Sequence, residues 1–156
     1  MVKINRIILT ENGFTLIETL IALIITGILT ISTFPTLLRL YDFYQLNQVV
    51  STLQSDLHYI RDHNMGPYKS SERLSIRIYA FENRYTVSFD PHGQTHLPRQ
   101  LHQNITIPLT YPLMILTFTS QGTVSQGFTL PIRSKYYSKE LVFSIGTGGF
   151  DIRDSE

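Results

Sequence analysis

The chain has 156 residues, with 13 Lys and Arg against 12 Asp and Glu, for a formal net charge of +1. This near balance argues against a protein whose whole surface binds nucleic acid. The absence of cysteine excludes disulfide frameworks, thiolate zinc sites and a cysteine nucleophile. The length suggests one domain, or one domain with an appendage.

An apolar block near the N-terminus dominates the first part of the chain. It runs from Phe14 to Phe34 and contains one charged residue, Glu18. A helix of about 20 residues rises ~1.5 Å per residue and reaches about 30 Å, one hydrocarbon thickness. A secretory signal peptide would have a shorter apolar region followed by a small-residue cleavage site. An ordinary membrane anchor explains the length of the block but leaves Glu18 unexplained.

Glu18 is costly in this setting, because a carboxylate inside a bilayer costs about 2.5–3.5 kcal/mol even on mild insertion scales. No Lys, Arg or His lies between Gly13 and Arg39 to neutralise it. Cleavage after Gly13 would create a cation, the new amine of Phe14, at the i, i+4 spacing from Glu18. In a helical assembly that amine could equally meet Glu18 of a neighbouring subunit.

The run Gly13–Glu18 resembles the prepilin peptidase motif of type IV pilins and pseudopilins. The resemblance implies cleavage after Gly13, N-methylation of Phe14 and a role for Glu18 as the assembly carboxylate. Family members often carry a proline in the same helix, and Pro35 stands in that place. The implied partners are the prepilin peptidase and N-methyltransferase, the membrane before assembly, and other major and minor pilin subunits of a helical filament.

A helical period continues beyond the apolar block until the breaker Asn64–Pro67. One face of this second half is predicted to pack on a core; its members are Leu46, Val49, Val50, Leu53, Leu57 and Ile60. The prediction is one helix from about Phe14 to about His63, kinked or softened at Pro35, which lacks an N–H. The chain is therefore predicted to consist of four segments. They are a leader (1–13), a transmembrane and assembly helix (14–35), an amphipathic helix (36–65) and a β-rich head (66–156).

The period drops to two after Gly66, as expected for half-buried strands. The predicted strands are Arg73–Tyr79, Tyr85–Phe89, Gln103–Ile107, Leu113–Thr119, Gly127–Ile132, Leu141–Ile145 and Phe150–Ile152, with a turn at Asp90–Gly93. Short spacings with Gly and Pro between them favour an antiparallel sheet. The predicted fold class is α+β, a pilin-like lollipop of one long helix and a small antiparallel head.

The order of motifs in the head is similar to that of one pseudopilin branch. These motifs are Leu97-Pro98, Ile115–Phe118 with Gly122, and Leu141–Ile145 before Gly146–Phe150. The branch includes the GspH type of type II secretion and the ComGD-type pilin of Gram-positive competence systems. Relatives often carry Arg where Gly149 stands here. The short head and absent cysteine favour the ComGD type.

The sequence contains no pattern typical of an active site. There is no HExxH, GxSxG or Walker A motif. The five histidines lack the spacing of a metal site, so they are interpreted as solvated; they are His58, His63, His92, His96 and His102. Gly146–Gly149 is interpreted as a hairpin turn, because a phosphate cradle should precede a helix. The chain is therefore predicted to be no enzyme and to need no metal or cofactor.

One short segment combines cations with aromatic rings, as a DNA contact does. Its candidate residues are Arg133, Lys135, Tyr136, Tyr137 and Lys139. The alternative is a solvated strand connection whose tyrosines pack on the core. Without the first 13 residues, positive and negative side chains balance, so electrostatic attraction of DNA to the whole head would be weak.

The resemblance implies a minor pilin of a competence type IV pilus, needed for uptake of transforming DNA across the cell envelope. Such a protein would span the cell membrane once, with a cytoplasmic N-terminus before cleavage, and then reach the cell surface in the pilus. Two alternatives remain open. One is a subunit of a type II secretion system or another type IV filament, and the other is a pilus subunit that itself binds DNA.

Overall fold

The structure is a computed structural model that describes residues 14–67, 72–89, 95–146 and 148–155. The leader 1–13 and the predicted turn Asp90–Gly93 therefore lie outside the described residues. The chain divides into two compact units, one ending at Leu38 and the other running from Arg39 to Glu156.

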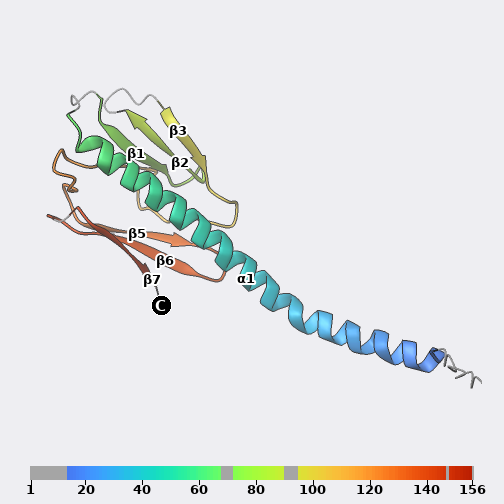
Figure 1. The fold of residues 1–156 in the computed structure, drawn as a ribbon. Helices are drawn as coiled ribbons and strands as arrows, with labels where there is room; N and C mark the ends of the chain where they lie inside the picture. Colours follow the sequence, from blue (N-terminus) through green and yellow to red (C-terminus); the bar gives the residue numbers. More distant parts are fainter. Residues whose placement is uncertain (1–13, 68–71, 90–94, 147, 156) are drawn as a thin grey trace, which may run out of the picture. The chain divides into compact units, whose positions relative to one another are not determined.

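One helix, α1 (Leu16–Asn64), forms the whole N-terminal part of the described chain (Figure 1). Pro35 lies inside it, and the helix continues through this residue. The prediction of one long helix ending at the Asn64–Pro67 breaker is confirmed. The fold class, a long helix followed by antiparallel sheets, is confirmed as well.

Seven strands follow the helix and form two antiparallel sheets. The strands are β1 (Leu74–Tyr79), β2 (Arg84–Phe89), β3 (Thr95–Gln100), β4 (Leu113–Thr117), β5 (Phe128–Arg133), β6 (Ser138–Phe143) and β7 (Phe150–Asp154). The first sheet has the order β3-β2-β1-β4 and the second β5-β6-β7. In the first sheet Leu74 pairs with Phe89 and Ser75 pairs with Thr117.

The core of the second unit lies along one face of α1. The predicted stripe is buried at Leu46, Val50, Leu53, Leu57 and Ile60, with Val49 partly buried against it. These side chains join the inward positions of the strands in one cluster. Alternate residues of a strand point to one face, which is why the buried members of β1 and β2 include Leu74, Ile76, Ile78, Tyr85 and Val87.

Asn64 ties the end of α1 to the first sheet. Its amide nitrogen donates to the carbonyls of Leu74 at 2.8 Å and Phe118 at 3.2 Å, and its oxygen accepts from the Leu74 N–H at 2.8 Å. The residue is buried, so these bonds satisfy groups that water cannot reach. Asn64 therefore both ends the helix and fixes the start of β1.

One predicted strand is wrong. Ile105 and Ile107 are both buried, which produced the alternation at Gln103–Ile107, but this segment makes only the isolated bridge between Thr106 and Arg133. The strand of this region is β3 instead. It carries Pro98, which lacks an N–H and is tolerated because β3 is an edge strand of its sheet.

The glycine-rich segment connects β6 to β7, which pair as neighbours. Gly146 and Gly148 have φ values of 88° and 60°, a left-handed conformation that glycine adopts without a Cβ clash. A Cβ at Gly148 would lie 1.7 Å from the carbonyl oxygen of Gly122. The segment is thus a hairpin turn whose backbone approaches a second turn closely.

Candidate functional site

The first turn of α1 is closed by Thr15 and Glu18. The carboxylate of Glu18 accepts from the backbone N–H and the hydroxyl of Thr15, both at 3.3 Å, and the Thr15 hydroxyl oxygen accepts from the Glu18 N–H at 3.3 Å. This reciprocal pattern is a capping box, which satisfies orphan donors at a helix N-terminus. The Thr-x-x-Glu spacing was readable in the sequence, and its capping role was missed there.

Phe14 lies just before the helix, and 84% of it is exposed. Glu18 is also exposed, so the carboxylate occupies a helix end that carries partial positive charge. Gly13, the predicted cleavage position, lies outside the described residues. Phe14 and Glu18 thus stand at the first turn of one helix, where a free amine on Phe14 would be close to the capped end.

The helix up to Leu38 exposes its apolar side chains all round. Five of its hydroxyl groups nevertheless bond within the helix. Four of them donate to the carbonyl four residues earlier at 2.8–2.9 Å, namely Thr26, Thr30, Ser32 and Thr33, and the Thr19 hydroxyl donates to the Leu16 carbonyl at 2.8 Å. Because a bilayer offers no hydrogen-bond partners, polar groups satisfied within the helix suit a lipid environment.

By length and composition, α1 can cross a membrane, with a window of mean hydropathy 2.0 and none of that window buried. A signal sequence near the N-terminus would pass the same test. The capped carboxylate and the uninterrupted helix beyond Leu38 are the features that a cleaved signal sequence does not need. This helix is the candidate site for membrane anchoring and subunit packing.

The five residues of the predicted DNA patch lie on the hairpin that joins β5 to β6. Arg133 ends β5 and Lys139 lies in β6. The structure brings all five residues to one hairpin, where Arg133, Tyr136 and Tyr137 line an open pocket of roughly 550 Å³ together with Lys139 and Phe43.

Asp42 of α1 holds this hairpin. Its carboxylate accepts from the hydroxyl of Ser134 at 2.6 Å and from the N–H of Tyr136 at 3.0 Å. Asp42 is only 4% exposed, and two hydrogen bonds from the hairpin compensate for the burial of its charge. Sequence reasoning missed Asp42, since its partners lie more than 90 residues away along the chain.

Two of the three cations of the hairpin have side-chain partners within the molecule. Lys139 pairs with Asp154 at 3.3 Å and lies 5.9 Å from the centre of the Phe43 ring. Lys135 lies 5.2 Å from the centre of the Tyr136 ring. These contacts use part of the patch to dock the hairpin, and they leave Arg133 exposed.

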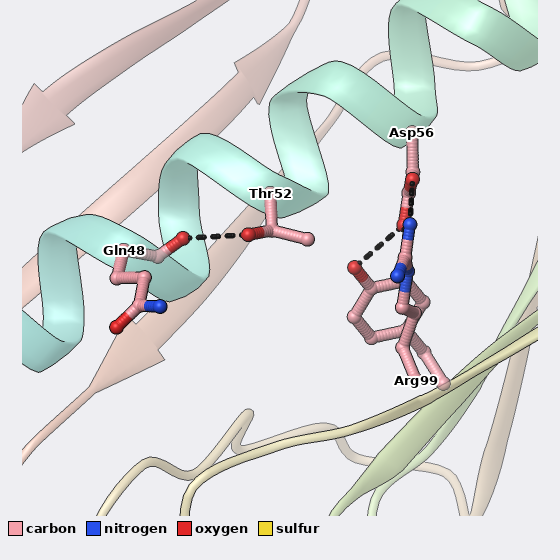
Figure 2. Close-up of polar contacts among 5 residues, drawn as sticks. Gln48, Thr52, Asp56 and Arg99 are labelled. Carbon is pink, nitrogen blue, oxygen red and sulfur yellow. Dashed lines mark hydrogen bonds and ion pairs between the residues drawn. The ribbon is translucent and has the colours of Figure 1, made fainter.

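Asp56 forms a second buried charge on α1 (Figure 2). Its carboxylate accepts from two guanidinium nitrogens of Arg99 at 3.0 and 3.1 Å, and from the Tyr85 hydroxyl at 2.8 Å. Burial, with the hydrogen bond to Asp56, raises the pKa of Tyr85 above its ordinary value of 10.0. The hydrogen bond and charge of Asp56 raise the pKa of Arg99. A pocket of roughly 390 Å³ lies beside this group. The Arg99 guanidinium in its lining is already hydrogen-bonded to the Asp56 carboxylate.

The described histidines contact aromatic rings or an amide group. His58 packs on Phe150 with ring centres 4.7 Å apart, and His96 stacks beside Tyr59 at 6.1 Å. His102 lies 3.0 Å from the Gln45 amide, and His92 is outside the described residues. Within the described ranges no group of three His, Cys, Asp or Glu could hold a metal ion.

Residues 9–34 match the family described as the prokaryotic N-terminal methylation motif. The match covers the predicted cleavage position, Phe14, Glu18 and the apolar half of α1. Comparisons with curated proteins and with solved structures find no match. The motif supports a type IV pilin-like or pseudopilin subunit that is processed by a prepilin peptidase, assembles with other pilin subunits and is anchored in a membrane by α1.

Proposed function

We propose that the chain is a minor pilin, or pseudopilin, of a competence type IV pilus, a structural subunit needed for uptake of transforming DNA across the cell envelope. The observation that carries the proposal is the methylation motif at the start of an apolar helix whose only charge before Arg39 is Glu18. The chain acts as a building block and as a substrate of the peptidase and N-methyltransferase.

Maturation follows from the positions of these residues. Cleavage after Gly13 removes the leader 1–13 and frees the amine of Phe14, which is then methylated. Glu18 provides the complementary charge for that amine or for the amine of a neighbouring subunit. Residues 14–35 span the membrane and then pack in the filament, residues 36–65 continue onto the head, and residues 66–156 form the head. Pro35 supplies the place where the helix bends.

The location changes during this sequence. The unprocessed chain crosses the cell membrane once with its N-terminus in the cytoplasm, as the positive Lys3 and Arg6 of the leader favour. The assembled subunit reaches the cell surface in the pilus.

The assignment to a competence system rests on the order of the head motifs, which is similar to their order in ComGD-type pilins. A pseudopilin of type II secretion, or a subunit of another type IV filament, would carry the same N-terminal motif. The kinds of genes that flank this one separate the alternatives, because a competence operon and a secretion operon encode different companions.

The central test compares Glu18→Ala with Thr15→Ala in full-length chains. Both changes remove the capping box, which costs about 0.5–2 kcal/mol of helix stability, but only the first removes the carboxylate. We expect Glu18→Ala to insert in the membrane yet be absent from sheared pili, and Thr15→Ala to enter them. Equal incorporation of both variants would contradict the role of Glu18.

The biological readout is uptake of labelled DNA by a strain that lacks this gene. We expect uptake to be lost, and to be restored by the wild type but not by Glu18→Ala. Unchanged uptake would contradict the competence role while leaving a pilin of a secretion, adhesion or motility filament.

A second candidate function is direct DNA contact by the β5–β6 hairpin. The exposed Arg133 and the half-exposed rings of Tyr136 and Tyr137 favour it, together with Lys135 and Lys139. Binding of DNA by the detergent-solubilised chain should then fall steeply with salt and be weakened by Arg133→Gln. Absence of binding at low salt would contradict it.

A further inference from the structure

Four strands form the outer edges of the two sheets, namely β3, β4, β5 and β7. An edge strand exposes unpaired backbone groups, and proteins commonly protect such edges with prolines or charges. β3 carries Pro98 and Arg99, and β5 carries Pro131 and Arg133. β7 is protected in the same way by Asp151, Arg153 and Asp154.

β4 lacks this protection. Its sequence, LMILT, contains neither proline nor charge. No Asp, Glu, Lys or Arg occurs anywhere between Arg99 and Arg133, so the flanking segments are uncharged as well. The outward side chains of Leu113 and Ile115 are 39% and 51% exposed. β4 is thus an apolar edge without proline or charge in a head whose other described edges carry them, and among the described residues the chain itself bridges this side only just beyond β4, between Phe118 and Val124.

A pocket of roughly 250 Å³ lies along β4. One wall is Met114–Thr117 of β4, and the other is formed by Val124, Ser125, Gln126 and Phe128. Its volume is below the about 300–1,000 Å³ of small-molecule sites. Its size and its uncharged walls suit an anchoring side chain of a strand laid along β4.

We infer that the free edge of β4 binds an extended strand of a different filament subunit, one that is uncharged and carries apolar residues at alternate positions. Main-chain hydrogen bonds to β4 would give the affinity, and the pocket would select the side chain. This inference rests on the proposed function, because it requires a filament in which subunits are neighbours.

Two arguments favour a different subunit over a second copy of this chain. Subunits that enter a filament from one membrane share one direction, so their contacts are head-to-tail and two β4 edges cannot pair about a two-fold axis. A second copy would have to offer β3, β5 or β7, whose prolines and charges make them poor partners for an apolar edge.

The test uses the full-length chain in sheared filaments and in detergent. Amide hydrogen exchange in β4 should be about tenfold slower, or more, in filaments than in detergent, while exchange in β7 stays similar. Ile115→Lys should be depleted from filaments, because it places a charge on the edge at an exposed position. The matched control is Thr129→Lys, an exposed position on the edge strand β5, which should be incorporated normally.

Each other outcome overturns a defined statement. If the wild type is present in filaments but its β4 amides are not protected from exchange, the inference is overturned and the proposed function is not. Equal incorporation of Ile115→Lys and Thr129→Lys would have the same consequence. A disulfide in filaments between one chain carrying Ile115→Cys and a second carrying Thr129→Cys on the edge strand β5, in a protein with no other cysteine, would overturn the different subunit in favour of a second copy. Absence of the wild type from filaments would overturn the proposed function and this inference with it.

Discussion

The residues of α1 before and after Leu38 treat polar groups in opposite ways. Before Leu38, five hydroxyl groups bond to carbonyls of their own helix, as Thr30 does to the Thr26 carbonyl at 2.8 Å. After Leu38, buried polar groups bond to strands far away in the sequence, as Asp56 does to Arg99. The first pattern needs no outside partner and suits lipid or tightly packed neighbouring helices. The second pattern holds a domain together.

The comparison shows that apolar content alone does not define the surroundings of a helix. Leucine is common in both halves, but apolar side chains cover the whole circumference before Leu38 and are buried along one face after it. The destination of each polar side chain is the more specific sign of what surrounds a given stretch.

The largest expected effect is that of Asp56→Ala. The change leaves the Tyr85 hydroxyl and the Arg99 guanidinium without their acceptor, and we expect the head to lose about 2–4 kcal/mol of unfolding free energy. Denaturant unfolding of the detergent-solubilised chain, followed by circular dichroism, measures it. Thr30→Ala is the matched control from the other half and should change the value by less than about 0.5 kcal/mol. Equal effects of the two variants would contradict the comparison.

A smaller effect is expected at alkaline pH. The raised pKa of Tyr85 means that the unfolded chain loses this proton first, so stability is intact below the ordinary value of 10.0 and falls above it. At pH 11 the loss from this group should be about 1.4 kcal/mol. Tyr85→Phe, which keeps the ring, should unfold with a shallower dependence on pH above 10. Parallel pH profiles would contradict the assignment.

The sequence predicted the helix, its buried stripe and six of the strand positions in part or in full, because period and breaker signals are local. β3 was missed since Pro98 and Arg99 argue against a strand unless the chain is known to lie at a sheet edge. A strand was wrongly predicted at Gln103–Ile107, because two buried isoleucines two residues apart resemble the alternation of a strand.

The candidate site divides in the same way. Phe14 and Glu18 could be identified from a contiguous motif, and the capping box with Thr15 could have been read from the same residues. Asp42 and Asp56 could not, because a lone carboxylate in an amphipathic helix looks solvated until the fold supplies Ser134 or Arg99. Contacts across the fold carry no local signal in one sequence.

The attachments of α1 to the strands have a mechanical consequence. Asp42, Asp56 and Asn64 lie at successive places along the helix, and each bonds to a different part of the head. Tension along the helix axis would act on these three attachments at the same time and in shear. The force would then be shared among them and not be carried by one attachment alone. The head is thereby built to stay on its helix when the helix is pulled.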